Sequence, residues 1–275
     1  MYYSYEEAKV ILEKKSKYLV IDYKEHVLNI TLNRPEKKNA MDGLFMRELA
    51  MALAFAKGNN DIRVVLIKAN GDIFSAGADL KGFAGKHNES EDSPAFDKNS
   101  KVILGDEFKS IYKPCIAKVH APVYAGGFLI LGGCTHVLST LKATYTLPEV
   151  KRGLWPFQVM ESLMDIIPSR KLLDWCMLGT TLSANKAFEY GIVTQVTQDE
   201  EDLDQSTEKL IKEIISNSPT AIRMGIKAYH ELQELKKNER NTFLHGRLQE
   251  LIQSKDAQEG LQAFLEKRKP KWTGE

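Results

Sequence analysis

Short runs rich in β-branched residues, separated by segments of helical pattern, constrain the fold of this chain more than any other feature. The first two runs, residues 18–23 and 27–33, flank Lys24-Glu25-His26, and this arrangement predicts a hairpin. The later runs are apolar and short, which is typical of strands buried on both faces. Strand, helix and strand in this order favour crossover connections and partly parallel pairing. The later runs cover residues 62–68, 115–119 and 136–140.

A helix is predicted to start after Asp42, whose side chain can cap the first turn. Met46, Leu49 and Leu53 then follow helical spacing. The preceding segment, residues 34–39, contains a proline and is expected to end the second strand, because proline has no N–H group for the ladder.

The pattern after residue 155 is helical to the end of the chain. Asn217-Ser218-Pro219 separates two amphipathic stretches. Asp256 followed by Glu259 resembles a capping box at the start of a last helix, whose apolar face contains Leu261, Phe264 and Leu265. We therefore predict an α/β core over residues 1–200 and a helical region over residues 201–275 that depends on packing partners.

The charge balance of the 275-residue chain argues against nucleic-acid binding. Lysine and arginine total 38 and aspartate and glutamate total 37, which leaves a net charge of +1. Proteins that bind nucleic acids usually carry a basic surplus. The longest apolar run covers residues 49–56, far short of the ~20 residues that a membrane span requires.

The N-terminal sequence and the cysteines favour a reducing compartment. Acidic residues occur early and no apolar segment follows Met1, so no secretory signal is predicted. Cys115, Cys134 and Cys176 are odd in number and widely spaced, which fits core packing rather than disulfides or a metal site. We expect a cytoplasmic protein that contacts no membrane.

Two turns with small residues follow predicted strands. One covers residues 74–80 (FSAGADL) and the other residues 124–129 (YAGGFL), which open a helix. Small residues allow close approach of the backbone, and the first N–H groups of a helix are free. Each turn alone is common in proteins. If the two strands are neighbours, the turns can direct two N–H groups at one developing oxyanion.

The sequence resembles the crotonase superfamily, the enoyl-CoA hydratase/isomerase family. Five stretches carry the resemblance in matching order over nearly the whole chain. The family fold is a spiral of ββα units, with a C-terminal helical region that forms trimers or dimers of trimers. The five stretches are LNRPEKKNAM (32–41), FSAGADL (74–80), KPCIAKVHAPVYAGG (113–127), TLPEVKRGL (146–154) and EGLQAFLEKRKPKW (259–272).

The resemblance implies an enzyme that binds an acyl-CoA thioester and polarises its carbonyl with two backbone N–H groups. By motif position these belong to Ala78 and Gly126. CoA is part of the substrate, so neither a separate cofactor nor a metal is implied. The residues that match substrate or CoA contacts of the family are Lys38, Ala40, Ala76, Gly77, Asp79, Leu80, Tyr124, Gly127, Pro148 and Trp155, with Phe264 and Lys267 reaching CoA in a neighbouring subunit.

Of the two catalytic glutamates of the family hydratases, this chain has only one. One hydratase glutamate lies three residues after the oxyanion glycine, where this chain has Leu129. The other belongs to a proline-glutamate element and is present as Glu149. A single base can move a proton from carbon 2 to carbon 4 of a 3-enoyl thioester. The resemblance therefore favours Δ3–Δ2 enoyl-CoA isomerisation with Glu149 as the base.

Two other functions stay open at this point. A hydratase, or an enzyme of another CoA-ester reaction, can use altered acid–base groups. A relative that binds acyl-CoA without catalysis is the non-enzyme alternative, which Leu129 supports and Glu149 opposes.

Several side chains have both a functional and an ordinary interpretation. Trp155 and Phe157 either narrow an acyl pocket or belong to the core. Asp106 and Glu107 are expected to interact with a helix start, and substitution for the missing acid is the alternative. His120 fits a structural role. The polar segment 86–100 is expected to be a surface loop, with a lid as the alternative.

Overall fold

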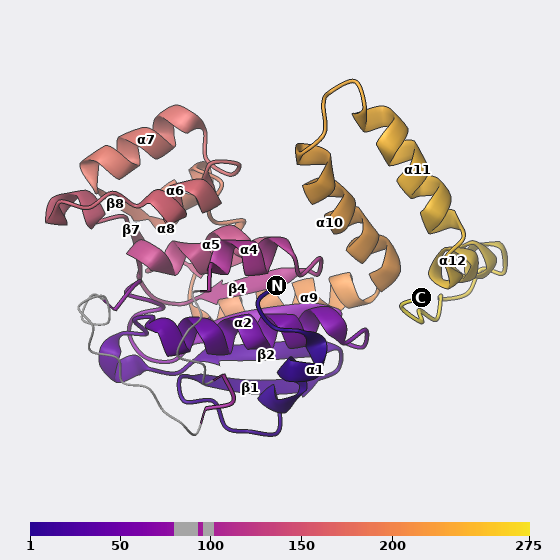
Figure 1. Ribbon diagram of the computed structural model, residues 1–275, viewed down its shortest axis with the longest axis horizontal. Helices are drawn as coiled ribbons and strands as arrows, with labels where there is room; N and C mark the ends of the chain where they lie inside the picture. Colours follow the sequence, from indigo (N-terminus) through magenta and orange to yellow (C-terminus); the bar gives the residue numbers. More distant parts are fainter. Residues whose placement is uncertain (80–92, 96–101) are drawn as a thin grey trace.

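The computed structural model of the protein describes residues 1–79, 93–95 and 102–275 (Figure 1). One sheet has six strands in the order β1-β2-β3-β4-β6-β9, and a second has three in the order β5-β7-β8. The strands are β1 (Leu19–Lys24), β2 (Val27–Leu32), β3 (Val64–Ala69), β4 (Cys115–Val119), β5 (Val123–Tyr124), β6 (His136–Thr140), β7 (Thr144–Thr146), β8 (Thr181–Ser183) and β9 (Gln195–Thr197).

The pairing of the large sheet confirms the expected hairpin and crossovers. Strands β1 and β2 are antiparallel and are joined by Glu25 and His26, both at positive φ. All later pairs of this sheet are parallel. The α-helices of the described residues are α1 (Tyr5–Ala8), which precedes the strands, and α2 (Gly43–Gly58), α4 (Leu104–Lys109), α5 (Phe128–Gly133), α6 (Phe157–Leu163), α7 (Ser169–Leu178), α8 (Ala184–Glu189), α9 (Glu200–Ile215), α10 (Pro219–Gln233), α11 (Arg240–Ile252) and α12 (Lys255–Leu265).

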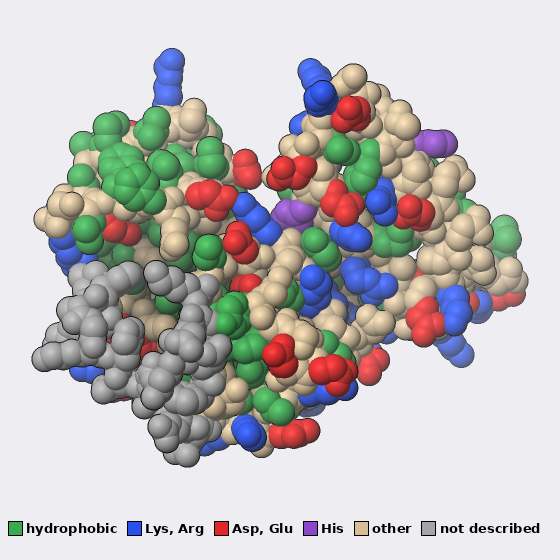
Figure 2. Space-filling view, viewed as in Figure 1, with side chains coloured by type: hydrophobic (Ala, Val, Ile, Leu, Met, Phe, Trp, Pro, Cys, Tyr) green, Lys and Arg blue, Asp and Glu red, His purple; other side chains and the backbone are tan. Residues whose placement is uncertain are grey.

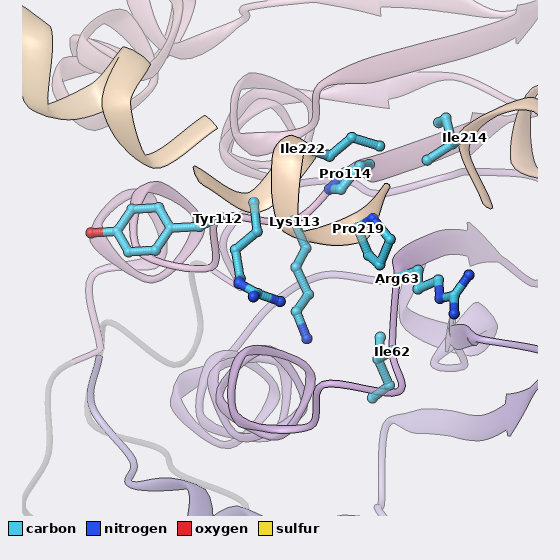
Figure 3. A pocket seen from close by; sticks show the side chains of 9 residues that line it. Ile62, Arg63, Tyr112, Lys113, Pro114, Ile214, Pro219 and Ile222 are labelled. Atoms are coloured by element: carbon cyan, nitrogen blue, oxygen red, sulfur yellow. The ribbon is translucent and has the colours of Figure 1, made fainter. Parts of the chain in front are cut away.

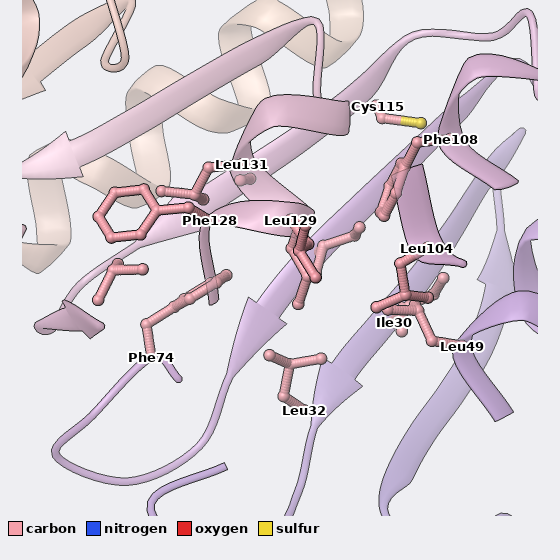
Figure 4. Packing of buried hydrophobic residues seen from close by; sticks show 14 of the residues in the cluster. Ile30, Leu32, Leu49, Phe74, Leu104, Phe108, Cys115, Phe128, Leu129 and Leu131 are labelled. Carbon is pink, nitrogen blue, oxygen red and sulfur yellow. The ribbon is translucent and has the colours of Figure 1, made fainter. Parts of the chain in front are cut away.

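Both faces of the large sheet are covered, which explains its continuous apolar strands. In β3, Val65 and Ile67 belong to the main core, which the helices α2, α4 and α5 complete (Figure 4). Val64 and Leu66 point to the other face, where Leu203 of α9 packs against them. Successive side chains of a strand alternate between faces, so the first four residues of β3 are buried by one layer or the other.

Helix α2 begins where the sequence predicted it. The Asp42 carboxylate accepts a hydrogen bond from the Phe45 N–H group at 2.9 Å. Twelve residues of the helix are buried, because sheet strands and α1 and α4 surround it.

The prediction of helices alone after residue 155 is wrong. Two strands, β8 and β9, lie between the helices, and β9 extends the large sheet beside β6. Strands β5 and β7, before residue 155, also form without a clear signal in the sequence. All four are two or three residues long, so they are too short to show an alternating pattern.

The last helix begins at a different residue from the predicted one. Ser254 caps α12 by accepting a hydrogen bond from the Ala257 N–H group at 3.1 Å. Asp256 lies inside the helix and is fully buried, where its carboxylate accepts hydrogen bonds from the N–H groups of Thr273 and Gly274. Asp256 therefore fixes the C-terminal segment rather than the helix start.

Helices α10, α11 and α12 extend away from the sheets (Figure 1), whereas α9 packs on the large sheet through Leu203. The boundary at residue 200 stays a prediction. None of the helices in the described part of the chain is long and apolar enough to cross a membrane.

Candidate active site

Three backbone segments from distant parts of the sequence run in parallel at the candidate site. Ser75 forms a parallel bridge with Val123, and Val123 pairs with Tyr145 in the parallel register of β5 and β7. Because the three segments have the same direction, their following residues emerge at one edge. These following residues include Ala78, Gly126 and Glu149, which the resemblance marks as catalytic.

The turns at Gly77 and Gly126 lie so close together that Gly77 has no room for a side chain. A Cβ atom built on Gly77, whose φ is +83°, lies 2.5 Å from the Gly126 nitrogen and 2.9 Å from the Tyr124 oxygen. A Cβ atom built on Gly126 lies 3.2 Å from the Ala78 nitrogen. The N–H groups of Ala78 and Gly126 therefore border one small volume.

Both of these N–H groups are available to a ligand. Gly126 is the second residue of the 3-10 helix η3 (Ala125–Gly127), and a helix offers no carbonyl to its first N–H groups. Ala78 bridges Met41, but Gly77 and Asp79 make the two hydrogen bonds of that bridge. Neither N–H group has a partner within the residues that the structure describes. Two such donors at one volume can stabilise an oxyanion.

The segment that contains Lys38 and Ala40 holds the first turn from behind. The Met41 N–H group donates to the Gly77 oxygen at 2.8 Å, and the Asp79 N–H group donates to the Met41 oxygen at 2.9 Å. The Ala76 N–H group donates to the Lys38 oxygen at 2.9 Å. Lys38 itself is exposed, and its φ of +56° belongs to the left-handed region.

Asn39 is a buried residue of this segment that no sequence pattern singled out. Its side chain accepts a hydrogen bond from the Arg34 N–H group and donates to the oxygens of Asn70 and Ile73. Ser75 donates to the Asn39 oxygen at 3.0 Å. The partners of Asn39 after β3 lie more than 30 residues along the chain, which is why no local pattern indicated them.

The second turn is anchored by the aromatic residue that follows it. Phe128 is fully buried and packs edge-on against Trp175, with ring centroids 5.2 Å apart. A Cβ atom on Gly127 would lie 3.0 Å from a methyl group of Val123 and 3.1 Å from the Ser75 Cβ atom. Close packing therefore sets the position of the turn from Tyr124 to Gly127.

Glu149 begins the 3-10 helix η4 (Glu149–Arg152), directly after Pro148. Its Oε2 atom is buried and has no hydrogen-bond partner among the described residues. Burial raises the pKa of this carboxyl, although a hydrogen bond from its own backbone and the nearby Arg152 act in the opposite direction. A carboxyl with a raised pKa suits proton transfer near neutral pH.

Leu129 does not provide a second carboxylate. Its side chain is 8% exposed and lies in the main core, among the buried apolar residues that Figure 4 labels. Position 129 therefore supplies no carboxyl to the site, and Glu149 is the carboxyl that follows the third parallel segment.

The two candidate replacements for the missing acid have other roles. Glu107 is buried in α4, and its Oε1 atom accepts a hydrogen bond from the Tyr2 N–H group at 2.8 Å. Asp106 lies in the first turn of the same helix, and Ile103 occupies the cap position. Neither carboxylate has a recorded contact with the two oxyanion turns in the described part of the chain. The Nε2 atom of His120 lies 2.7 Å from the Gly71 oxygen, which agrees with the structural role expected for this histidine.

The two aromatic residues that follow Glu149 differ in their exposure to solvent. Trp155 is half-buried against the main core, whereas Phe157 is 70% exposed and is not a core residue. Leu80 and most of the segment 86–100 lie outside the described residues, so the CoA contact of Leu80 and the lid stay predictions.

Phe264 and Lys267 are not brought to the turns within one chain. Phe264 is 80% exposed on α12, which excludes the core interpretation, and Lys267 follows the helix at a φ of +54°. Figure 1 shows α12 on the opposite side of the molecule from β7 and β8. A contribution to the site therefore requires a neighbouring subunit.

Two cavities in the described part of the chain lie away from the turns. A small cavity of about 10 Å³ is lined by Lys113, Arg63 and Arg223, between the large sheet and α10 (Figure 3). A larger cavity of about 360 Å³ lies between α6 and α10, where Figure 2 shows the surface hollowed. No cluster of His, Cys, Asp or Glu able to hold a metal occurs in the described ranges.

The similarity to known protein sequences extends over nearly the whole chain. Residues 22–275 match the family model described as enoyl-CoA hydratase/isomerase. Carnitinyl-CoA dehydratase from Salmonella enteritidis is 32% identical over 257 residues, which cover 90% of this chain and 95% of the relative. Human enoyl-CoA hydratase domain-containing protein 3, mitochondrial, is 27% identical, covering 90% of this chain and 81% of the relative.

Solved structures agree with these relatives. The enoyl-CoA hydratase from Bacillus anthracis has a TM-score of 0.82 and 26% identity, covering 94% of this chain and all of that one. The enoyl-CoA hydratase from Mycobacterium tuberculosis has a TM-score of 0.81 and 28% identity, covering 94% and 99%. The crotonase fold expected from the sequence is thus confirmed, and the chain is an enzyme of the enoyl-CoA hydratase/isomerase family.

Proposed function

We propose that this enzyme converts a 3-enoyl-CoA to a 2-enoyl-CoA, with Glu149 as its only base. The observation that carries the proposal is Leu129. It is a buried apolar residue at the position where the family hydratases have their other glutamate. Hydration of a double bond in those enzymes uses two carboxylates to hold and activate water. Among the described residues, position 129 supplies no carboxylate and Glu149 supplies the one that matches the family.

The geometry supports a proton shuttle through an enolate. Glu149 removes a proton from carbon 2, and the negative charge moves to the thioester oxygen. The N–H groups of Ala78 and Gly126 stabilise that oxygen, and loss of one such donor typically costs about 3–4 kcal/mol. The protonated carboxyl then returns the proton to carbon 4, which leaves the double bond between carbons 2 and 3.

The addition or removal of water is the second candidate function. It is favoured by the names of the relatives, which include hydratases and a dehydratase. A water molecule held by Glu149 alone would be the nucleophile in that reaction.

A pair of substrates tests the proposal. The purified enzyme is incubated with a 3-enoyl-CoA and, separately, with a 2-enoyl-CoA, and the products are separated by chromatography against both isomers as standards and then identified by mass. We expect rapid conversion of the 3-enoyl-CoA without a change of mass in ordinary water. In heavy water, a shuttling carboxyl should return part of the original proton to carbon 4. Rapid gain of 18 mass units by the 2-enoyl-CoA would favour the hydratase instead.

The proposal includes the partners of the enzyme. The substrate is an acyl-CoA thioester, which brings its own CoA, and no separate cofactor or metal is required for the steps above. We propose a homotrimer or a dimer of trimers as the active assembly. The three free cysteines support a reducing compartment, and we propose the cytoplasm.

A further inference from the structure

Arg34 is a buried arginine directly behind the candidate oxyanion turn. The residue lies just after the end of β2 and is 5% exposed. The Nη1 atom donates to the Ala40 oxygen at 2.7 Å and lies 3.4 Å from Asp42 Oδ2. The Nη2 atom lies 3.1 Å from Asp79 Oδ2, and the guanidinium stacks 4.6 Å from the centroid of the Tyr18 ring.

The contacts of Arg34 join its own segment, which runs through Ala40 to Asp42, to the oxyanion turn at Asp79. Asp42 caps α2, Ala40 belongs to the segment behind the turn, and Asp79 directly follows Ala78. The planar guanidinium can hold all three at fixed angles, which the single ammonium of a lysine cannot do. A buried ion pair often adds little to the stability of a protein, because removing both charges from water is costly. Stability alone therefore does not explain why the pair of Arg34 and Asp79 lies beside the site.

Fixing Asp79 also fixes the N–H group of Ala78. The Gly77 oxygen and the Asp79 N–H group are both bonded to Met41, so the peptide groups on either side of Ala78 are held by the backbone. The Asp79 carboxylate adds a third restraint through Arg34. We propose that Arg34, acting through Asp79, is a positioning residue that aims the Ala78 N–H group at the thioester oxygen. This inference rests on the proposed function.

The carbonyl stretch of a bound thioester tests the proposal directly. Butyryl-CoA labelled with ¹³C at the thioester carbonyl is saturated and has no double bond to move. Its carbonyl frequency in the complex reports how strongly the two N–H groups polarise the oxygen. We expect a lowered frequency with the wild-type enzyme and a smaller lowering with Asp79→Asn and Arg34→Lys.

Turnover of a 3-enoyl-CoA gives the second readout. A displacement of about 1 Å at a catalytic group can cost about 100-fold in rate. We therefore expect kcat to fall about 10- to 100-fold in both variants while KM changes less than about threefold. The double variant should lose little more than either single one, because both changes remove the same pair.

Arg47→Lys is the matched control. Arg47 is also 5% exposed, and its Nε atom donates to the Ala95 oxygen rather than to the turn. This variant should lose stability without a change of kcat or carbonyl frequency. Normal kcat and normal carbonyl frequency in folded Asp79→Asn would overturn the inference and leave the proposed function intact. No frequency change with the wild-type enzyme would overturn the oxyanion site itself, and the inference with it.

Discussion

Glu149 owes its chemical character to a position between core and solvent. One carboxylate oxygen is buried without a partner among the described residues, and burial raises the pKa of the group. The ionised form is therefore less stable than in water, which makes it a better proton acceptor. The folded state binds this proton more tightly than the unfolded chain, so the contribution of Glu149 to stability falls as pH rises through its folded pKa.

Replacement of Glu149 by glutamine should separate binding from turnover. Glutamine keeps the shape of the side chain but cannot accept the proton, and a general base typically contributes about 100- to 10,000-fold in rate. We expect a loss of kcat in that range, unchanged affinity for butyryl-CoA, and stability at neutral pH at least equal to that of the wild type. Steady-state kinetics, calorimetric titration and thermal unfolding measure the three quantities.

Glu161→Gln is the control for this change, because Glu161 is an exposed carboxylate on α6 that pairs with Lys109. It should leave kcat unchanged. A Glu149→Gln enzyme with full activity would contradict the single-base mechanism.

Lys113 is a second residue with an unusual environment, far from the proposed chemistry. It is 3% exposed, and its Nζ atom donates to the oxygens of Ala56 and Asn59 at the end of α2. Burial lowers its pKa to about 7, and Arg223 adds to the shift. An unfolded lysine titrates near ~10.4, so the unfolded chain binds more protons at this site between about pH 7 and pH 10.

The stability of the protein should consequently include a term that rises with pH in this range. One proton of difference corresponds to at most about 1.4 kcal/mol per pH unit. Lys113→Met should remove that term, which urea unfolding at pH 7, 8 and 9 can measure. Lys212→Met, at an exposed position on α9, is the control and should keep the wild-type slope. Equal slopes for wild type and Lys113→Met would show that Lys113 does not titrate as stated.

At the scale of elements, the site depends on how closely two turns approach. Gly77 has a φ of +83°, and the backbone of the opposite turn fills the space that its Cβ atom would need. Gly274 has a similar φ of +80°, but its nearest neighbours lie 3.8 Å from a Cβ atom. The two glycines thus separate the cost of the backbone conformation from the cost of the contact.

Gly77→Ala should push the two turns apart and move one oxyanion donor. Loss of such a donor typically lowers kcat about 100- to 1,000-fold. Gly274→Ala should cost only the left-handed conformation, about 1–2 kcal/mol of stability, and leave kcat unchanged. Kinetics and urea unfolding of both variants provide the comparison. Equal kcat values would show that the approach of the turns does not matter for turnover.

The elements predicted from the sequence were those whose signals are local. The strands β1 to β4 and β6, the cap at Asp42 and the break at Asn217-Ser218-Pro219 all show their patterns within a few residues. The approach of the two turns was also predicted, because both follow strands of one expected sheet, and the bridge between Ser75 and Val123 confirms that they are neighbours.

The features that were missed depend on partners distant in sequence. Strands of two or three residues, such as β5 and β9, exist only because a neighbouring strand pairs with them. Asp256 precedes a glutamate by three residues, as a cap does, whereas its true partners, Thr273 and Gly274, come from the C-terminal segment. Arg34 contacts Asp79, 45 positions away, and no local pattern indicates such a pair.

At the scale of the whole molecule, large apolar side chains remain exposed on two surfaces. Figure 2 shows one of them over α6 and α7, where Phe157 and Met164 are 70% and 59% exposed. The other lies on the C-terminal helices. A single chain that exposed both to water would be prone to association. The exposed large apolar residues of α11 and α12 are Leu244, Leu248, Ile252, Leu261, Phe264 and Leu265.

The last prediction is that these helices join subunits. Light scattering at micromolar concentration should give three or six times the 31.1 kDa of one chain. Phe264→Glu together with Leu265→Glu places two charges on the most exposed apolar part of α12, where burial against a partner would cost far more than exposure to water. This variant should dissociate and lose affinity for CoA, because the resemblance assigns Phe264 and Lys267 to the site of a neighbour. Leu12→Glu, at an exposed position near the N-terminus, should stay assembled. A wild-type chain that scatters as a monomer would contradict the assembly, and an assembled double variant would show that the contact lies elsewhere.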